Sequence, residues 1–153
     1  MKAVVQRVSR ARVLVDGEVV GACGPGLLVL LGVMQGDGEA EVRWIADRIA
    51  GYRVFADDQG RMNRSALELG REVLVVSQFT LAADGRRGRR PSFDRAAPPQ
   101  VAEPLYEAVA RDLEAQGLAV ARGRFGAMMA VELVGDGPAT FLLESPSGGS
   151  AQG

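Results

Sequence analysis

The sequence contains no histidine and a single cysteine, Cys23, and each scarcity excludes a class of chemistry. Without histidine, the Ser-His-Asp and Cys-His catalytic arrangements are impossible, and so is any metal site built on imidazole. A lone cysteine cannot form an internal disulfide and offers no paired spacing for zinc. We therefore expect no metal and no cofactor, a buried and reduced Cys23, and a cytoplasmic protein.

Long apolar runs and net charge are also scarce. The longest apolar run, residues 26–34, is too short to span a bilayer, and charged residues interrupt the first eight positions, unlike a signal peptide. The net charge of −1 argues against a generally basic nucleic-acid binder but allows a local basic patch. A chain of 153 residues that is 47% hydrophobic can bury one substantial core, which predicts one compact domain.

Strand patterns outnumber helical ones along the chain. Asp16-Gly17 between two alternating segments predicts a hairpin of residues 4–15 and 18–23, and the apolar run 27–33 predicts a central strand buried on both faces. Helical spacing predicts a helix over 39–52 capped by Asp37, and a second over 104–116 with Pro104 in its first turn and Gly117 at its end. Further strands are expected at 53–55, 72–78, 118–121, 128–134 and 139–143, with turns at 57–60 and 135–138.

These elements predict an α+β fold in which a small, barrel-like, antiparallel-rich sheet has two helices packed outside it. We expect one domain over residues 1–144. Residues 145–153 are rich in serine and glycine, which predicts a disordered tail.

A long polar loop between residues 81 and 99 holds four arginines, Arg86, Arg87, Arg89 and Arg90, followed by Phe93. Loops of this length without regular structure are uncommon in compact domains and are usually functional or disordered. The arginines are compatible with a merely solvated loop. They are equally compatible with phosphate contact, since an arginine cluster beside an aromatic ring suits a flexible single strand of RNA.

Three segments together resemble the D-aminoacyl-tRNA deacylase family. They are Ser77-Gln78-Phe79-Thr80-Leu81, the loop from Gly88 to Phe93, and residues 123–129 leading into Gly135-Asp136-Gly137-Pro138-Ala139-Thr140. The resemblance extends from Met1 to about Leu143. It implies a homodimeric enzyme, acting on the acceptor end of aminoacyl-tRNA, that hydrolyses the ester bond to a D-amino acid, or to glycine mischarged on alanine tRNA, in translation quality control.

The resemblance assigns the catalytic role to Gln78, Phe79 and Thr80, with Ser77 beside them at the substrate. From the residues alone, the same segment also fits an ordinary strand end. In the functional interpretation, the Phe79 N–H faces a developing oxyanion, while Gln78 and Thr80 offer polar groups. Because no residue is a convincing general base, the resemblance implies that the 2′-hydroxyl of the terminal adenosine assists the reaction.

Gly137-Pro138 alone indicates only a turn between two strands. The resemblance implies a cis peptide whose carbonyl oxygens reach across the dimer interface and exclude L-side chains from the partner's pocket. It also places Met129 on the wall of that pocket, although a methionine in a strand is more often plain core. The arginine loop then becomes the tRNA-binding element.

The sequence departs from the family pattern at Gly135, Ala139, Met128 and Arg64, where asparagine, valine, aspartate and a hydrophobic residue are common. Two other interpretations stay open. One is an editing domain of the same fold, resembling that of archaeal threonyl-tRNA synthetases, and the other is a tRNA-binding module without activity.

Overall fold

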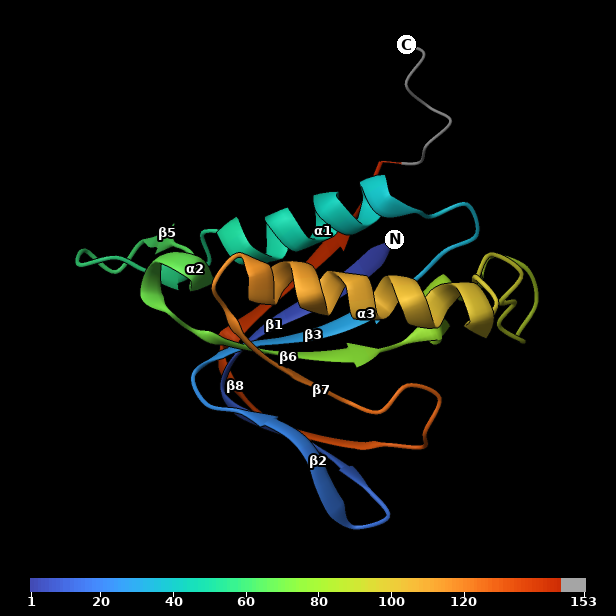
Figure 1. The fold of residues 1–153 in the computed structure, drawn as a ribbon, viewed down its shortest axis with the longest axis horizontal. Helices are drawn as coiled ribbons and strands as arrows, with labels where there is room; N and C mark the ends of the chain where they lie inside the picture. Colours follow the sequence, from blue (N-terminus) through green and yellow to red (C-terminus); the bar gives the residue numbers. More distant parts are fainter. Residues whose placement is uncertain (147–153) are drawn as a thin grey trace.

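The main sheet is built around β1 (Lys2–Val15), which pairs with three other strands. Along one edge it pairs antiparallel with β3 (Gly26–Gly32) and then with β2 (Glu18–Cys23), and along the other with β8 (Ala130–Glu144). β6 (Glu72–Ser77) lies parallel to β3, and β7 (Ala119–Arg122) lies parallel to β6. The computed structural model, which describes residues 1–146, is thus a single α+β domain with a curled sheet (Figure 1).

Two long helices, α1 (Glu39–Gly51) and α3 (Pro99–Ala115), cover one face of this sheet (Figure 1). The remaining elements are short: β4 (Phe55–Ala56) pairs with β5 (Met62–Arg64), α2 (Ala66–Leu69) follows, and the 3-10 helix η1 (Phe79–Ala82) follows β6. The predicted class, a barrel-like sheet with helices outside, is confirmed. No helix within residues 1–146 is long and apolar enough to cross a membrane.

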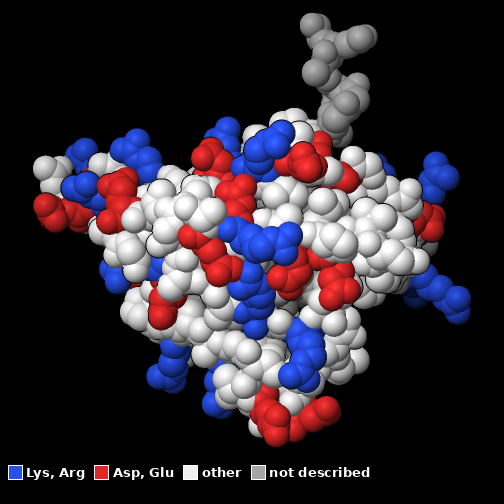
Figure 2. All heavy atoms as spheres, viewed as in Figure 1, with Lys and Arg blue, Asp and Glu red and all other residues white. Residues whose placement is uncertain are grey.

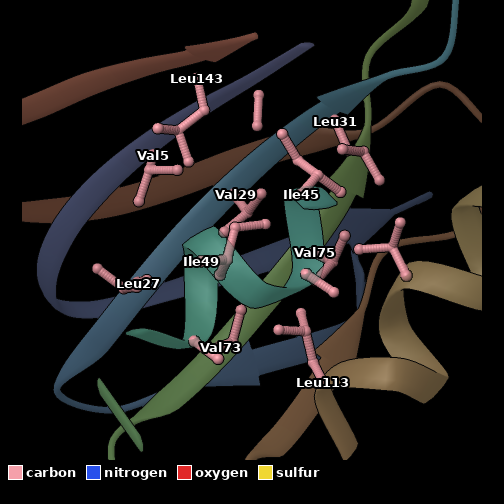
Figure 3. Packing of buried hydrophobic residues seen from close by; sticks show 14 of the residues in the cluster. Val5, Leu27, Val29, Leu31, Ile45, Ile49, Val73, Val75, Leu113 and Leu143 are labelled. Carbon is pink, nitrogen blue, oxygen red and sulfur yellow. The ribbon is translucent and has the colours of Figure 1, made fainter. Parts of the chain in front are cut away.

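The core lies on both faces of β3, as the continuous apolar run predicted. Leu27, Val29 and Leu31 pack under α1 and α3 in the larger cluster (Figure 3). Leu28 points to the opposite face, in a smaller cluster inside the curled sheet that also contains Cys23. Burial raises the pKa of the Cys23 thiol, with a further contribution from the negative charge of Glu72. Cys23 is therefore a small buried hydrophobe, as expected.

The curl brings β2 against β7 without a strand pairing between them. A Cβ placed on Gly21 of β2 would lie 2.2 Å from the carbonyl oxygen of Arg122 in β7. Only glycine permits this approach, which closes most of the barrel. The turn between β1 and β2 has positive φ at Asp16 and Gly17, +50° and +80°, as the Asp-Gly hairpin signal predicted.

We expect Gly21→Ala to lower the free energy of unfolding by roughly 1–3 kcal/mol, because the added methyl group must push β2 and β7 apart. Urea unfolding followed by circular dichroism measures it. Gly51→Ala is the matched control. A Cβ at Gly51, the last residue of α1, meets nothing within 4 Å, and alanine there should raise stability slightly. Equal free energies of unfolding for the two variants would contradict the close approach of β2 to β7 at Gly21.

Both predicted helices exist, but their starts are corrected. Gly38, not Asp37, occupies the N-cap of α1, and Asp37 instead accepts the Met34 N–H at 2.7 Å and pairs with the Met1 amino group. α3 begins at Pro99, so that Pro104 lies inside the helix and not in its first turn. The pair Pro98-Pro99 is the reason. Pro99 favours extended backbone at Pro98, which precedes the helix, and Pro99 itself suits the first helical position.

The predicted strands 53–55 and 72–78 are shifted or shortened to β4 and β6. A larger correction concerns the end of the chain, where strands 128–134 and 139–143 were expected on either side of a turn. β8 is one strand that pairs with β1 on both sides of residues 136–139. Of the predicted tail 145–153, Ser145 is buried and its N–H donates to the Met1 carbonyl at 2.9 Å, and residues 147–153 lie outside the described part.

Gly135–Pro138 is therefore a bulge and not a hairpin turn. Val8 pairs with Gly135 and Gln6 with Thr140, so β8 advances five residues while β1 advances two. The additional residues of β8, within 136–139, leave the ladder as an outward bulge, which we call the Gly-Pro bulge. Because β1 is long enough to pair on both sides of it, the chain continues in the same direction.

Candidate functional site

The segment Ser77–Thr80 leaves the sheet at the end of β6. Ser77 is the last residue of the strand and pairs with Leu31 of β3, and the Gln78 N–H donates to the Leu31 carbonyl at 2.8 Å. The buried run from Val73 to Val76 anchors the strand beneath it. The backbone entering the segment is thus fixed by the core, while the side chains after Ser77 reach the surface.

Gln78 and Thr80 face each other across the start of η1. The Gln78 side-chain amide donates to the Thr80 hydroxyl, while the ring of Phe79 between them is 59% exposed. The Phe79 N–H has no hydrogen-bond partner within residues 1–146. A backbone donor without a protein partner, flanked by an amide and a hydroxyl, is the kind of group that can meet a developing negative charge on oxygen.

Met129 lies beside this segment on the loop between β7 and β8. Its sulfur accepts the Arg124 N–H at 3.4 Å, and it packs against the small cluster that includes Val76 of β6. Gly123 allows the contact, since a Cβ there would meet the sulfur at 2.9 Å. The half-buried Met129 serves partly as core and lies near the end of β6, and its role in the wall of a pocket stays a prediction.

The Gly-Pro bulge is exposed on β8, and the Gly137-Pro138 peptide is cis. A Cβ on Gly137, at φ +149°, would lie 2.4 Å from the Ala139 nitrogen, so only glycine fits there. Within residues 1–146, no hydrogen bond or ion pair joins the bulge to Ser77–Thr80. One chain therefore presents the two predicted halves of the site as separate features.

Arg7 of β1 holds the bulge, and it was not among the predicted site residues. Its guanidinium donates to the Asp136 carbonyl at 3.0 Å and to the Val54 carbonyl at 2.6 Å, and it pairs with the Asp136 carboxylate at 3.2 Å. The Arg7 side chain is only 14% exposed. The sequence gives no signal that singles it out, since Arg10 and Arg12 lie on the same strand.

The predicted arginine loop forms a closed hairpin. Asp84 and Ser92 each donate a backbone N–H to the other's carbonyl, at 2.9 and 3.2 Å, and we call residues 84–92 the arginine hairpin. All four arginines are exposed, and basic side chains protrude at the edge of the molecule where this loop lies (Figure 2). Arg86 pairs with Asp84 through hydrogen bonds that lower the pKa of that carboxyl. The other three form no ion pair within residues 1–146.

Phe93 follows the hairpin and turns inward. Its half-buried ring meets the Phe79 ring edge-on, with centroids 5.2 Å apart and an interplanar angle of 65°. The predicted RNA-stacking residue therefore packs against the predicted catalytic segment. Ser77 to Thr80, Met129 and Phe93 come together in the structure, and Gly137 and Pro138 do not join them within one chain.

Two further features bear on the chemistry. A hollow of about 420 Å³ lies over β1, β2 and β8, lined by Arg10, Arg12, Cys23, Glu132 and neighbouring apolar residues, and none of the predicted site residues borders it. In the described part of the chain, no cluster of three or more acidic or cysteine side chains is arranged to hold a metal.

Known proteins of similar sequence and structure were found by comparison. The sequence profile of the family described as D-Tyr-tRNA(Tyr) deacylase matches residues 4–144. A D-aminoacyl-tRNA deacylase of Roseiflexus castenholzii is 63% identical over 145 residues, covering 95% of this chain and 92% of the relative. One of Heliobacterium modesticaldum is 57% identical over 150 residues, covering 98% of this chain and all (100%) of the relative.

Two solved structures share the fold. The c-Myc DNA Unwinding Element Binding Protein superposes with a TM-score of 0.89 at 41% identity, over 95% of this chain and 99% of that one. A probable eukaryotic D-amino acid tRNA deacylase superposes with a TM-score of 0.77 at 16% identity, over 93% of this chain and 97% of that one. The second likeness concerns the fold alone.

Proposed function

Because this chain belongs to the D-Tyr-tRNA(Tyr) deacylase family, we propose that it hydrolyses the ester bond between tRNA and a D-amino acid, or glycine mischarged on alanine tRNA. The observation that carries the proposal is the Phe79 N–H at the fixed end of β6, which has no hydrogen-bond partner within residues 1–146 and is flanked by Gln78 and Thr80. The products are free tRNA and the free amino acid. The reaction removes wrongly charged tRNA before translation uses it.

In the proposed mechanism, Phe79 stabilises the charge that develops on the ester oxygen. The oxygen of water attacks the ester carbonyl carbon, and the π electron pair of the C=O bond moves to the carbonyl oxygen. The Phe79 N–H donates to the oxyanion that forms. Gln78 holds the substrate, and its bond to Thr80 orients both side chains. The tetrahedral intermediate then collapses, and the C–O bond to the 3′-oxygen of the terminal adenosine breaks. The sequence offers no histidine to carry the proton, and the adjacent 2′-hydroxyl passes the proton of the attacking water to the departing 3′-oxygen, which leaves as a hydroxyl.

Selection of the D-form works by exclusion. In a twofold dimer, the Gly137 and Pro138 carbonyls of one subunit enter the other's pocket beside Met129, in the space that an L-side chain requires. Arg7 fixes the direction of the bulge through Asp136 and Val54. Glycine has no side chain to reject, so this arrangement passes glycyl-tRNA as well.

The exposed apolar side chains along β8 support the dimer. Val131, Leu133, Val134 and Leu142 lie on this strand and are 36%, 39%, 42% and 80% exposed, and the outer edge of β8 pairs with no strand in the described chain. A long apolar edge strand left bare is an aggregation hazard, so proteins cover it. In the proposed dimer, a second copy of the chain covers these apolar side chains of β8. The same contact brings the Gly-Pro bulge of the second copy to the catalytic segment of the first.

We expect Leu142→Glu to shift the protein from dimer to monomer and to abolish most of its turnover. Each site would lose the part of its pocket that the partner's Gly-Pro bulge supplies. Light scattering at micromolar concentration measures the mass. Val101→Glu, a charge at a 45% exposed position in the first turn of α3, is the matched control and should remain dimeric. A wild-type monomer with full activity would rule the composite site out.

The arginine hairpin is proposed to contact the phosphates of the acceptor end. Its exposed guanidinium groups lie on the loop that joins η1 to α3, next to the catalytic segment. Arginine suits phosphate through its planar array of donors, and the flexible single strand at the tRNA end suits a protruding loop.

A deacylation assay of the purified protein tests the proposed function. D-Tyr-tRNA and Gly-tRNA should be hydrolysed well above the spontaneous rate, and L-Tyr-tRNA should not. Hydrolysis of L-aminoacyl-tRNA instead would favour an editing domain of another acyl preference. Binding of tRNA with no hydrolysis of any substrate would favour a nucleic-acid-binding module.

A further inference from the structure

The arginine hairpin is tied to the body of the protein at both ends. On one side it continues directly from η1, whose end is closed by the Ala83 N–H donating to the Thr80 carbonyl at 3.0 Å. Across its base, Asp84 and Ser92 are joined by two backbone hydrogen bonds. The exposed arginines therefore project from a closed base that begins at Asp84, four positions after the catalytic segment ends at Thr80.

On the other side, the loop after β3 holds residues 94–97. The Gln35 N–H donates to the Arg95 carbonyl at 2.8 Å, and its side-chain amide donates to the Asp94 carbonyl at 2.5 Å. The Ala97 N–H donates to the Val33 carbonyl at 3.0 Å. Leu31 of β3 accepts the Gln78 N–H, so β3 and the loop that continues from it anchor the backbone on both sides of the site.

Phe93 lies between these two anchors, and its ring reaches the catalytic segment. The edge-on contact with Phe79 joins two segments that are 14 positions apart in the sequence. Phe79 is otherwise 59% exposed, and η1, which it begins, is only four residues long. The Phe93 ring is thus a lateral support for the residue whose N–H faces the proposed oxyanion.

We infer that Phe93 is a positioning residue: its ring holds Phe79 so that the arginine hairpin, which meets RNA, and the Phe79 N–H, which meets the ester, keep one fixed separation. This inference rests on the proposed function. It differs from the expectation drawn from the sequence, in which Phe93 stacks on an RNA base, because here its ring already has a protein partner.

Two substrates separate the two roles: D-Tyr-tRNA and the short ester 2′(3′)-O-D-tyrosyl-adenosine, which lacks the phosphates and bases that the hairpin meets. We expect Phe93→Ala to lower kcat on both substrates by roughly 10- to 100-fold, since a small misplacement of a catalytic group costs that much. KM for the short ester should change little. Phe93→Tyr, which keeps the ring, should restore kcat on both.

A base-stacking role predicts a different pattern. Phe93→Ala would then raise KM for D-Tyr-tRNA alone and leave the short ester unaffected, and that result would overturn the inference. Unchanged kcat on both substrates would overturn it as well. If Phe93→Ala does not fold, Phe93→Leu keeps side-chain bulk without the ring edge. A lowered kcat on the short ester then supports the inference, and wild-type kcat refutes it.

The control is Trp44→Ala, which removes another half-buried aromatic side chain, one that packs on Arg48 of α1. It should leave kcat on both substrates unchanged. If the wild-type protein hydrolyses neither substrate, the proposed function itself fails. If the wild type is active and only the Phe93 pattern is absent, the failure belongs to this inference alone.

Discussion

D-Tyr-tRNA whose terminal adenosine lacks the 2′-hydroxyl should be hydrolysed roughly 10²- to 10⁴-fold more slowly than the normal substrate, the usual range for a positioned acid-base group. The sequence holds no histidine, and the polar groups beside the Phe79 N–H are an amide and a hydroxyl. Neither takes a proton from water readily near neutral pH. In the proposed mechanism the proton leaves through the 2′-hydroxyl of the substrate.

Single-turnover kinetics measures this effect, because it separates the chemical step from binding. The binding affinity of the deoxy substrate should stay close to normal, since the 2′-hydroxyl is a small part of the contact. The companion variant is Thr80→Val, which removes the hydroxyl but keeps the shape. Turnover within about tenfold of the wild type fits a positioning role for Thr80, since one neutral hydrogen bond contributes about 0.5–1.5 kcal/mol. Full activity on the deoxy substrate together with an inactive Thr80→Val would instead make Thr80 the nucleophile.

Arg7→Ala should lower the preference for D-Tyr-tRNA over L-Tyr-tRNA by roughly 10- to 150-fold. Arg7 holds the Gly-Pro bulge through Asp136 and ties it to Val54, and hydrogen bonds to a charged group contribute about 1.5–3 kcal/mol each. When that support is lost, the carbonyls that exclude an L-side chain no longer point in one direction. The change should appear as faster hydrolysis of L-Tyr-tRNA, more than as slower hydrolysis of D-Tyr-tRNA.

The matched control is Arg12→Ala on the same strand. Arg12 also forms an ion pair, with Glu132, but its side chain is 50% exposed and it makes no contact with the bulge. Exposed pairs of this kind contribute little. If Arg7→Ala stays folded and dimeric and keeps the wild-type ratio of D- to L-hydrolysis, the bulge is held in place by other contacts.

The sequence predicted the elements that depend on local patterns. Asp16-Gly17 marked the hairpin, the run before Gly32 marked the central strand, and the helical spacings located α1 and most of α3. These signals come from turn chemistry and from the burial of nearby residues, which neighbouring positions encode. The end of β6 was predicted at 78 for the same reason, one residue beyond its end at Ser77.

What the sequence could not supply depends on pairing between distant segments. The parallel neighbours β3, β6 and β7, and the pairing of β8 with β1 on both sides of the bulge, are not visible in either strand alone. The role of Arg7 was not predicted, because its partners Val54 and Asp136 are 47 and 129 positions away in the sequence. Phe93 was assigned to RNA because its protein partner lies across a loop.

The pairing of β1 with β8 also has a consequence for the order in which the protein takes shape during synthesis. Lys2 pairs with Glu144, so the first strand to leave the ribosome meets one of its neighbours only when nearly the whole described chain has been made. At about 5–20 residues per second, the interval between Val15 and Glu144 is roughly 6–26 s. During that time β2 and β3 can already pair with β1, while the edge of β1 that receives β8 stays open. The Gly-Pro bulge is thus added late, to a sheet in which β1, β2 and β3 can already be paired.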